Sequence, residues 1–192
     1  MTSYEIIRSA MALTSTIYNF DVELADSDRG VYETLAVRAA LHPSETEEYL
    51  WTRVLAYCLE YEEGIAFSKG LSDGDEPALW IRDPAGRVKL WIEVGTPDAA
   101  RLHKAAKAAD RVAVYTHKEP RSLLRRLEGE RIHRAEEIPI HAVDRELLAD
   151  LVALLDRRMK MHLSVTGGHL YIDIAGRSLS GAVTEHRIGS AS

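Results

Sequence analysis

The stretch RVKLWIEVGTPDAARLHK, residues 87–104, decides the fold. Its first half alternates with the period of a β-strand, so we predict a strand over 87–94. One face of that strand carries Val88, Leu90, Ile92 and Val94. The other face carries Lys89, Trp91 and Glu93, which places a carboxylate at the carboxyl end of the strand. Such strand ends are where α/β sheets hold ligands.

The second half of the stretch predicts a helix that runs to about Asp110. Thr96 can cap this helix, Pro97 suits its first position, and Asp98 favours its positive end. Residues 111–116, which are mostly apolar, then predict a short buried strand. Because a strand, a helix and a strand with short connections form a right-handed parallel crossover, part of the sheet is expected to be parallel.

Antiparallel hairpins complete the expected sheet, so the predicted class is α/β (α+β), a mixed β-sheet flanked by helices. The turn Asp83–Gly86 joins strand 87–94 to a partner at 78–82. Hairpins are also predicted near both ends of the chain, with strands at 14–24 and 31–40 and at 161–166 and 169–174. The other predicted elements are strands 64–71 and 138–143, a helix to Leu59 that Ser44 and Glu47 begin as a capping box, and helices 122–128 and 144–158.

One domain is expected over residues 11–178, with 1–10 as a peripheral extension and 179–192 as a flexible tail. No apolar run is long enough to span a membrane, and a lone cysteine, Cys58, fits a cytoplasmic protein. The net charge of −6 argues against tight, non-specific nucleic-acid binding. It leaves room for a local basic face.

Glu93 is the first candidate for chemistry. A partly buried carboxylate must be paired or metal-bound, so Glu93 is either a ligand residue or the partner of Arg101 or Lys104 in a salt bridge. The hairpin brings Asp75 or Glu76 close to Glu93, although an acidic loop is ordinarily a solvated turn.

Two more acids, Glu45 and Glu48, share one face of a helix, where they also simply favour the helix dipole. Lys104 lies on the helix after Glu93, and most helix lysines are solvated. If Glu48, Asp75 and Glu93 converge near Lys104, they would suit Mg²⁺ or Mn²⁺. Such an ion could lower the pKa of a bound water and offset charge on a phosphoryl group.

Basic residues gather in the second half of the chain. They are Arg121, Arg125, Arg126, Arg131, Arg134, Arg157, Arg158 and Lys160. On one face they would form a phosphate-binding strip, whereas the glutamates interleaved with the first five favour an ion-paired, solvated surface.

Several motifs, in order and at matching spacing, resemble the YaeQ family across most of residues 11–174. They are His42-Pro43-Ser44-Glu45-Thr46 with Glu48, Gly70-Leu71, Asp75-Glu76-Pro77, Trp80, Trp91-Ile92-Glu93-Val94-Gly95, Pro97-Asp98, Arg101 and Lys104-Ala105. The resemblance implies a variant of the PD-(D/E)XK fold, which is restriction-endonuclease-like.

Carried over from that family, Glu48 would be the acidic residue of the first helix, with Glu45 as second choice. Asp75 or Glu76 would be the first motif carboxylate, and Glu93-Val94-Gly95 would be the (D/E)XK segment. The sequence departs from the active nuclease pattern at Gly95, where a lysine is usual. Lys104 on the next helix would replace that lysine.

Two functions follow from these residues. The first is a metal-dependent nuclease or phosphodiesterase, in which Glu48, Asp75 and Glu93 bind the ion and Lys104 assists the attack of water. The second is a non-catalytic, nuclease-like module that binds nucleic acid or a protein partner. In the second, the acids hold the first helix to the sheet through Arg53, Arg101 or Lys104.

Overall fold

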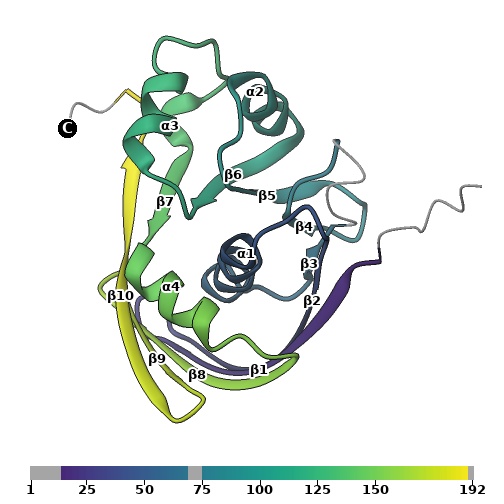
Figure 1. Ribbon diagram of the computed structural model, residues 1–192. Helices are drawn as coiled ribbons and strands as arrows, with labels where there is room; N and C mark the ends of the chain where they lie inside the picture. Colours follow the sequence, from purple (N-terminus) through teal and green to yellow (C-terminus); the bar gives the residue numbers. More distant parts are fainter. Residues whose placement is uncertain (1–13, 69–74, 190–192) are drawn as a thin grey trace, which may run out of the picture.

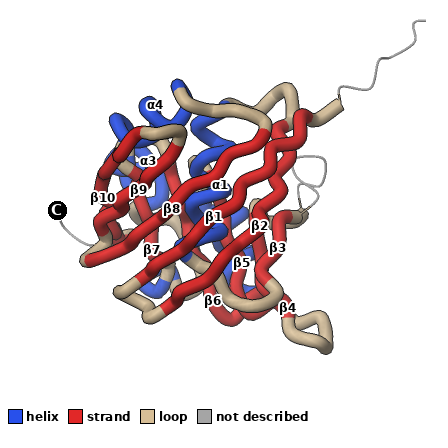
Figure 2. The backbone as a smooth tube through the Cα atoms, turned by 90° about the horizontal axis from the view of Figure 1, so that it is seen from below, coloured by secondary structure: helices blue, strands red, loops and turns tan. Residues whose placement is uncertain are grey.

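The computed structural model describes residues 14–68 and 75–189. Ten strands form a single sheet in the order β2-β1-β8-β9-β10-β7-β6-β5-β4-β3. The sheet curls around two helices, α1 and α4, so that its end strands, β2 and β3, lie side by side (Figures 1 and 2). No helix within the described residues is long and apolar enough to cross a membrane.

The elements follow one another along the chain with short connections. They are β1 (Thr16–Asp26), β2 (Val31–Leu41), α1 (Glu47–Leu59), β3 (Ile65–Phe67), β4 (Leu79–Arg82), β5 (Val88–Val94), α2 (Ala99–Ala108), β6 (Ala109–Thr116), α3 (Pro120–Leu127), the 3₁₀-helix η1 (Ala135–Glu137), β7 (Pro139–Val143), α4 (Arg145–Ala153), β8 (Arg158–Thr166), β9 (His169–Ile174) and β10 (Arg177–Arg187).

Strand β10 joins the two halves of the sheet. Its first part pairs antiparallel with β9, and its second part, from Val183, pairs antiparallel with β7. On one side, the hairpins β1–β2 and β8–β9 meet through a parallel pairing of β1 with β8. On the other side, β5, β6 and β7 are parallel, and β3 and β4 are antiparallel. The predicted mixed sheet and its three hairpins are confirmed.

Helix α1 occupies the hollow of the curled sheet and is buried over residues 50–56 and at Cys58. Its side chains Trp51 and Leu55 pack with β1 and β8, while Ala56 packs with β4, β5 and β6. Helices α2 and α3 cover the opposite face of β5, β6 and β7, where Leu102 and Leu123 share one cluster with Trp91. Side chains on the two faces of β5 therefore pack into two separate cores, Trp91 with α2 and α3 and Ile92 with α1.

Three local predictions were wrong, two about which residue caps a helix and one about the face on which Val88 lies. Thr46, not Ser44, caps α1 by accepting from the amide of Tyr49 at 3.2 Å, since the Ser44 hydroxyl contacts the Nδ1 of His42 at 2.7 Å. Asp98 caps α2 in place of Thr96. Val88 packs with the α2 side of the sheet, because the ladder between β4 and β5 shifts register at the start of β5.

The expected flexible tail, 179–192, was also wrong for residues 179–187, which lie in β10. The helix expected over 144–158 ends at Ala153, because the residues from Arg158 onward pair with β1 instead. The strand expected over 64–71 is observed as Ile65–Phe67, and the rest of that prediction from residue 69 lies outside the described residues. The peripheral extension predicted for 1–10 also lies outside them.

Gly181 in β10 allows α4 to lie directly against the strand. A Cβ atom at this position would stand 2.8 Å from the Cβ of Leu147 and 2.9 Å from the Cβ of Asp144, which no real structure tolerates without a shift. We expect Gly181→Ala to destabilise the fold by about 1–3 kcal/mol in urea unfolding, because overpacking forces the helix from the sheet. The neighbouring, exposed Ser180→Ala is the control. Equal stability of the two variants would contradict this packing.

Candidate functional site

The carboxylate of Glu93 is buried between β5 and α2, with only 4% of the residue exposed. Trp91, two residues earlier on the same face, donates from Nε1 to Oε1 of Glu93 at 2.6 Å. Arg101 on α2 donates from Nε to the same oxygen at 2.8 Å. The sequence left Glu93 either as a ligand residue or as the salt-bridge partner of Arg101 or Lys104. In the structure Glu93 forms the salt bridge with Arg101.

Arg101 ties together three parts of the chain. Its Nε binds Glu93 on β5, and its Nη2 donates to the backbone carbonyl of Glu76, just before β4, at 2.7 Å. Its own amide donates to the capping carboxylate of Asp98 at 2.8 Å. The predicted closeness of the 75–76 segment to Glu93 is thereby confirmed, with the guanidinium as the bridge.

Lys104, one turn further along α2, forms an ion pair with Asp75 at the surface. The hydrogen bond from Lys104 and its charge lower the pKa of Asp75, and Arg101 adds to the effect. Both side chains of the pair are more than half exposed, so the pair contributes little to stability. Two carboxylates and two cations thus lie close together, with Arg101 bonded to Glu93 and Lys104 bonded to Asp75.

The first helix contributes a separate ion pair. The Oε2 atom of Glu45 accepts from Nη2 of Arg53 at 3.1 Å and from the amide of His42 at 3.0 Å, with both charged side chains at most 5% exposed. Arg53 also donates to the carbonyl of Ala40 on β2. Glu45 therefore holds the start of α1 near β2 through Arg53. This is the structural role that the second of the two predicted functions gave to the acids. Glu48, in the first turn of α1, is exposed.

The backbone conformation of Gly95 explains why the lysine of the (D/E)XK pattern is absent at this position. Its φ is +96°, in the left-handed region that favours glycine, and its amide donates to the carbonyl of Tyr115 at 2.8 Å. A lysine here would be strained, so the cation has to come from α2. The residue that reaches Glu93 is Arg101, whereas Lys104, which was expected to take this place, contacts Asp75.

The predicted metal-binding trio of Glu48, Asp75 and Glu93 is not assembled. Across residues 14–68 and 75–189, no three Asp, Glu, His or Cys side chains are grouped so that they could hold a metal ion. A divalent cation beside Glu93 would also meet the guanidinium of Arg101, which already occupies the favourable position. The residues in this arrangement do not fit Mg²⁺ or Mn²⁺.

Two aromatic residues at the site were missed by the sequence analysis. Tyr49 of α1 lies over Gly95, with its Cε2 atom 3.8 Å from where a Cβ of residue 95 would be, and its ring meets that of His117 edge-on. Burial raises the pKa of Tyr49 and lowers that of His117. The Nδ1 atom of His117 is buried and has no hydrogen-bond partner among the described residues. Only the fold brings these two rings together, so no local signal identifies them.

Burial raises the pKa of Glu93 above its ordinary value of 4.5, outweighing the hydrogen bonds from Arg101 and Trp91 that lower it. The folded state therefore binds this proton more tightly than the unfolded state, and stability is lost as the pH rises through and above 4.5. We expect the stability advantage of the wild type over Glu93→Gln to shrink between about pH 4 and about pH 7, measured by urea unfolding. An advantage that grows with pH would show that the ion pair outweighs burial.

The comparisons with known proteins agree on one family. The family model described as "YaeQ protein" matches residues 11–182. The YaeQ protein of Escherichia coli (strain K12) is 32% identical over 163 residues, which cover 84% of this chain and 90% of that one. The YaeQ protein of Salmonella typhi is 32% identical over 170 residues, 88% and 94% of the two chains.

Solved structures of the family have the same fold. The crystal structure of the YaeQ protein from Pseudomonas syringae matches with a TM-score of 0.80 and 34% identity, covering 89% of this chain and 95% of that chain. The YaeQ protein from Xanthomonas axonopodis pv. citri matches with a TM-score of 0.81 and 29% identity, covering 91% and 99%. Sequence and fold together show that the chain belongs to the YaeQ family.

Proposed function

We propose that the chain is a nuclease-like module that binds nucleic acid on the outer face of α2 and α3 without cleaving it. One observation carries this proposal. In a chain of net charge −6, these two helices contain six lysines and arginines and no acidic residue. They are Arg101, Lys104, Lys107, Arg121, Arg125 and Arg126. We call this set the basic face.

The basic face has both the placement and the spare charge that phosphate binding requires. Both helices lie on the same side of the sheet, and Leu102 of α2 and Leu123 of α3 belong to one hydrophobic cluster there (Figure 1). Four of its six cations are exposed and form no ion pair with any described residue: Lys107, Arg121, Arg125 and Arg126. Unpaired lysines and arginines release counterions from a phosphate backbone, which is the main source of nucleic-acid affinity.

The acids beside this face support a positioning role. Glu93 holds the guanidinium of Arg101 in one orientation, and Asp75 holds the amine of Lys104. A cation fixed in advance loses less conformational freedom when it meets a phosphate. Under this proposal the carboxylates position the cations at one end of the basic face, and the exposed arginines of α3 extend it.

Binding to the basic face has a direct test. With fluorescein-labelled single-stranded and double-stranded DNA and RNA, we expect anisotropy to report an affinity that falls as salt rises. Lys107→Glu and Arg125→Glu should each weaken binding across all sequences and reduce the slope of log affinity against log salt by about one.

Lys160→Glu is the matched control, since Lys160 is an exposed cation on β8, distant in the sheet order from the strands that α2 and α3 cover. It makes the same change of charge and should leave the affinity unchanged. If Lys160→Glu weakens binding as much as Arg125→Glu does, only the net charge matters and the basic face is not the site.

A metal-dependent nuclease of the PD-(D/E)XK class is the second candidate. The observation in its favour is the element order α1-β3-β4-β5-α2-β6, with Glu93 at the end of β5 and Asp75 just before β4. The family resemblance implies a PD-(D/E)XK variant in which Asp75 and Glu93 are motif carboxylates. Against it stands the engagement of Glu93 with Arg101.

Calorimetry with Mg²⁺ and Mn²⁺ separates the two candidates. We expect wild type and Glu93→Gln to give the same heats, with no saturable binding to either, because Arg101 holds the place of the ion. Saturable Mn²⁺ binding that is lost in Glu93→Gln would contradict the non-catalytic binding module and favour the metal-dependent nuclease.

A further inference from the structure

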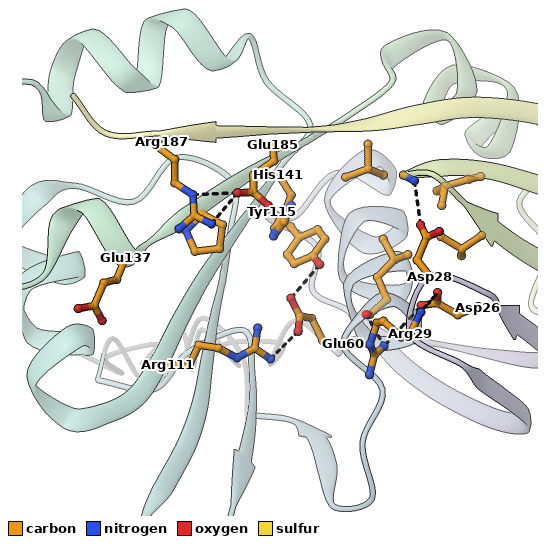
Figure 3. A pocket seen from close by; sticks show the side chains of 16 residues that line it. Asp26, Asp28, Arg29, Glu60, Arg111, Tyr115, Glu137, His141, Glu185 and Arg187 are labelled. Atoms are coloured by element: carbon orange, nitrogen blue, oxygen red, sulfur yellow. Dashed lines mark hydrogen bonds and ion pairs between the residues drawn. The ribbon is translucent and has the colours of Figure 1, made fainter. Parts of the chain in front are cut away.

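A cavity of about 520 Å³ opens on the concave side of the sheet, where its two halves meet (Figure 3). The β1–β2 turn, the end of α1, and strands β6, β7 and β10 contribute to its lining. None of the described residues that line it was predicted for the candidate site. Trp91, which shares a face of β5 with Glu93, packs with α2 on the other side of the sheet. The cavity is therefore separate from the site beside the basic face.

Glu60, the residue that caps the end of α1, lies in this cavity with its carboxylate already paired. Its Oε2 accepts from Nη2 of Arg111 at 2.7 Å, and its Oε1 accepts from the hydroxyl of Tyr115 at 3.0 Å. Only 7% of Glu60 is exposed. The charge of Arg111 is thus matched by a carboxylate that the fold holds in one place.

The other charged side chains of the lining are also matched. The ion pairs are Asp26 with Arg29, Glu185 with Arg187, and Glu137 with Arg134, which lies outside the lining. Asp28 accepts instead from the backbone amides of Gly167 at 2.7 Å and Gly168 at 2.9 Å. Figure 3 draws these contacts within the cavity as dashed lines. A charged ligand would therefore have to displace a partner that is already in place.

His141 on β7 is the polar side chain of the lining with an unused donor and acceptor. It lies in register between Tyr115 on β6 and Glu185 on β10, and its ring stacks on Tyr115 with the centroids 4.6 Å apart. The residue is partly buried, and neither ring nitrogen bonds to any described residue. Burial lowers the pKa of His141, although the charges of Glu60 and Glu185 act in the opposite direction. A neutral imidazole offers one donor and one acceptor to a ligand.

Apolar side chains form much of the remaining lining. Leu59 at the end of α1 and Val183 on β10 are only partly buried, and Pro139 and Val165 lie below the surface of the cavity. A ligand that covers Leu59 and Val183 removes apolar surface from water, which favours binding. The volume of about 520 Å³ is in the range of small-molecule sites.

We propose that this cavity binds a small uncharged molecule that carries an amide group on an apolar body. The amide has one acceptor and an adjacent donor, so it can bond to the imidazole of His141, while the body covers Leu59 and Val183. A charge on the ligand is disfavoured, because it would leave water without gaining a free counter-charge. The ion pairs of the lining therefore determine that the ligand is neutral.

Three probes of nearly the same shape test this selectivity. Benzamide is neutral, benzoate carries a negative charge, and benzamidine carries a positive charge. With binding followed by protein amide shifts in NMR titrations, we expect benzamide to bind at least about tenfold more tightly than either charged probe. The shifts should centre on His141 and its neighbours in β6 and β10. Benzoate or benzamidine binding as tightly as benzamide would overturn the proposal.

His141→Phe tests the hydrogen bond, because it keeps a ring beside Tyr115 and removes both nitrogens. We expect the affinity for benzamide to fall about two- to tenfold, the effect of one neutral hydrogen bond. His186→Phe makes the same change on the other face of β10, outside the lining, and should leave the affinity unchanged. An unchanged affinity in His141→Phe, or an equal loss in both variants, would contradict the role of His141.

Glu60→Gln tests why charged ligands are disfavoured. Glutamine still offers an acceptor to Tyr115, but it leaves Arg111 without its carboxylate. We expect the affinity for benzoate to rise about tenfold, because a charged hydrogen bond becomes available, while the affinity for benzamide stays the same. Glu62→Gln breaks the ion pair with Lys89 outside the lining and is the control. Benzoate affinity that does not rise in Glu60→Gln would show that the ion pair does not set the selectivity, against the proposal.

Discussion

The buried carboxylate of Glu93 has to be neutralised, and much of the arrangement around it follows from how this is done. The strand ends in a left-handed glycine, so no side chain directly after Glu93 can supply the positive charge. The charge comes instead from Arg101, one turn into the following helix, which fixes how α2 lies on β5. The same guanidinium holds the chain before β4 through a backbone carbonyl. One ion pair thus links a strand, a helix and a loop.

Positive and negative side chains are distributed differently on the two sides of β5, β6 and β7. The chain as a whole is acidic, yet the two helices on the outer side of β5, β6 and β7 contain only basic charges. On the concave side, acids and bases mix around the cavity between the two halves of the sheet. The ion pair of Glu93 belongs to the outer side. The basic face and the cavity therefore lie on opposite sides of β5, β6 and β7.

The sequence predicted what depends on local pattern and missed what depends on distant pairing. Glu93 and its partner Arg101 were both identified, because strand alternation and helix spacing place them on facing surfaces. Which cation would reach Glu93 could not be predicted, since two lay on one helix face. The sequence of strand β10 is polar, so it was predicted to be a flexible tail. The strand is held in place by pairing with β9 and β7, which the sequence alone does not reveal. Tyr115, His141 and Glu185 are neighbours only because of the register between β6, β7 and β10.

The claim that Glu93 is a structural partner of Arg101 is tested most directly by a double-mutant cycle. The free energies of unfolding of wild type, Glu93→Gln, Arg101→Gln and the double variant are compared in metal-free buffer. We expect a favourable coupling of about 1–3 kcal/mol, with Arg101→Gln the more damaging single change because it leaves a buried charge without its partner. A coupling below about 0.5 kcal/mol would contradict it, because the two side chains would then act independently.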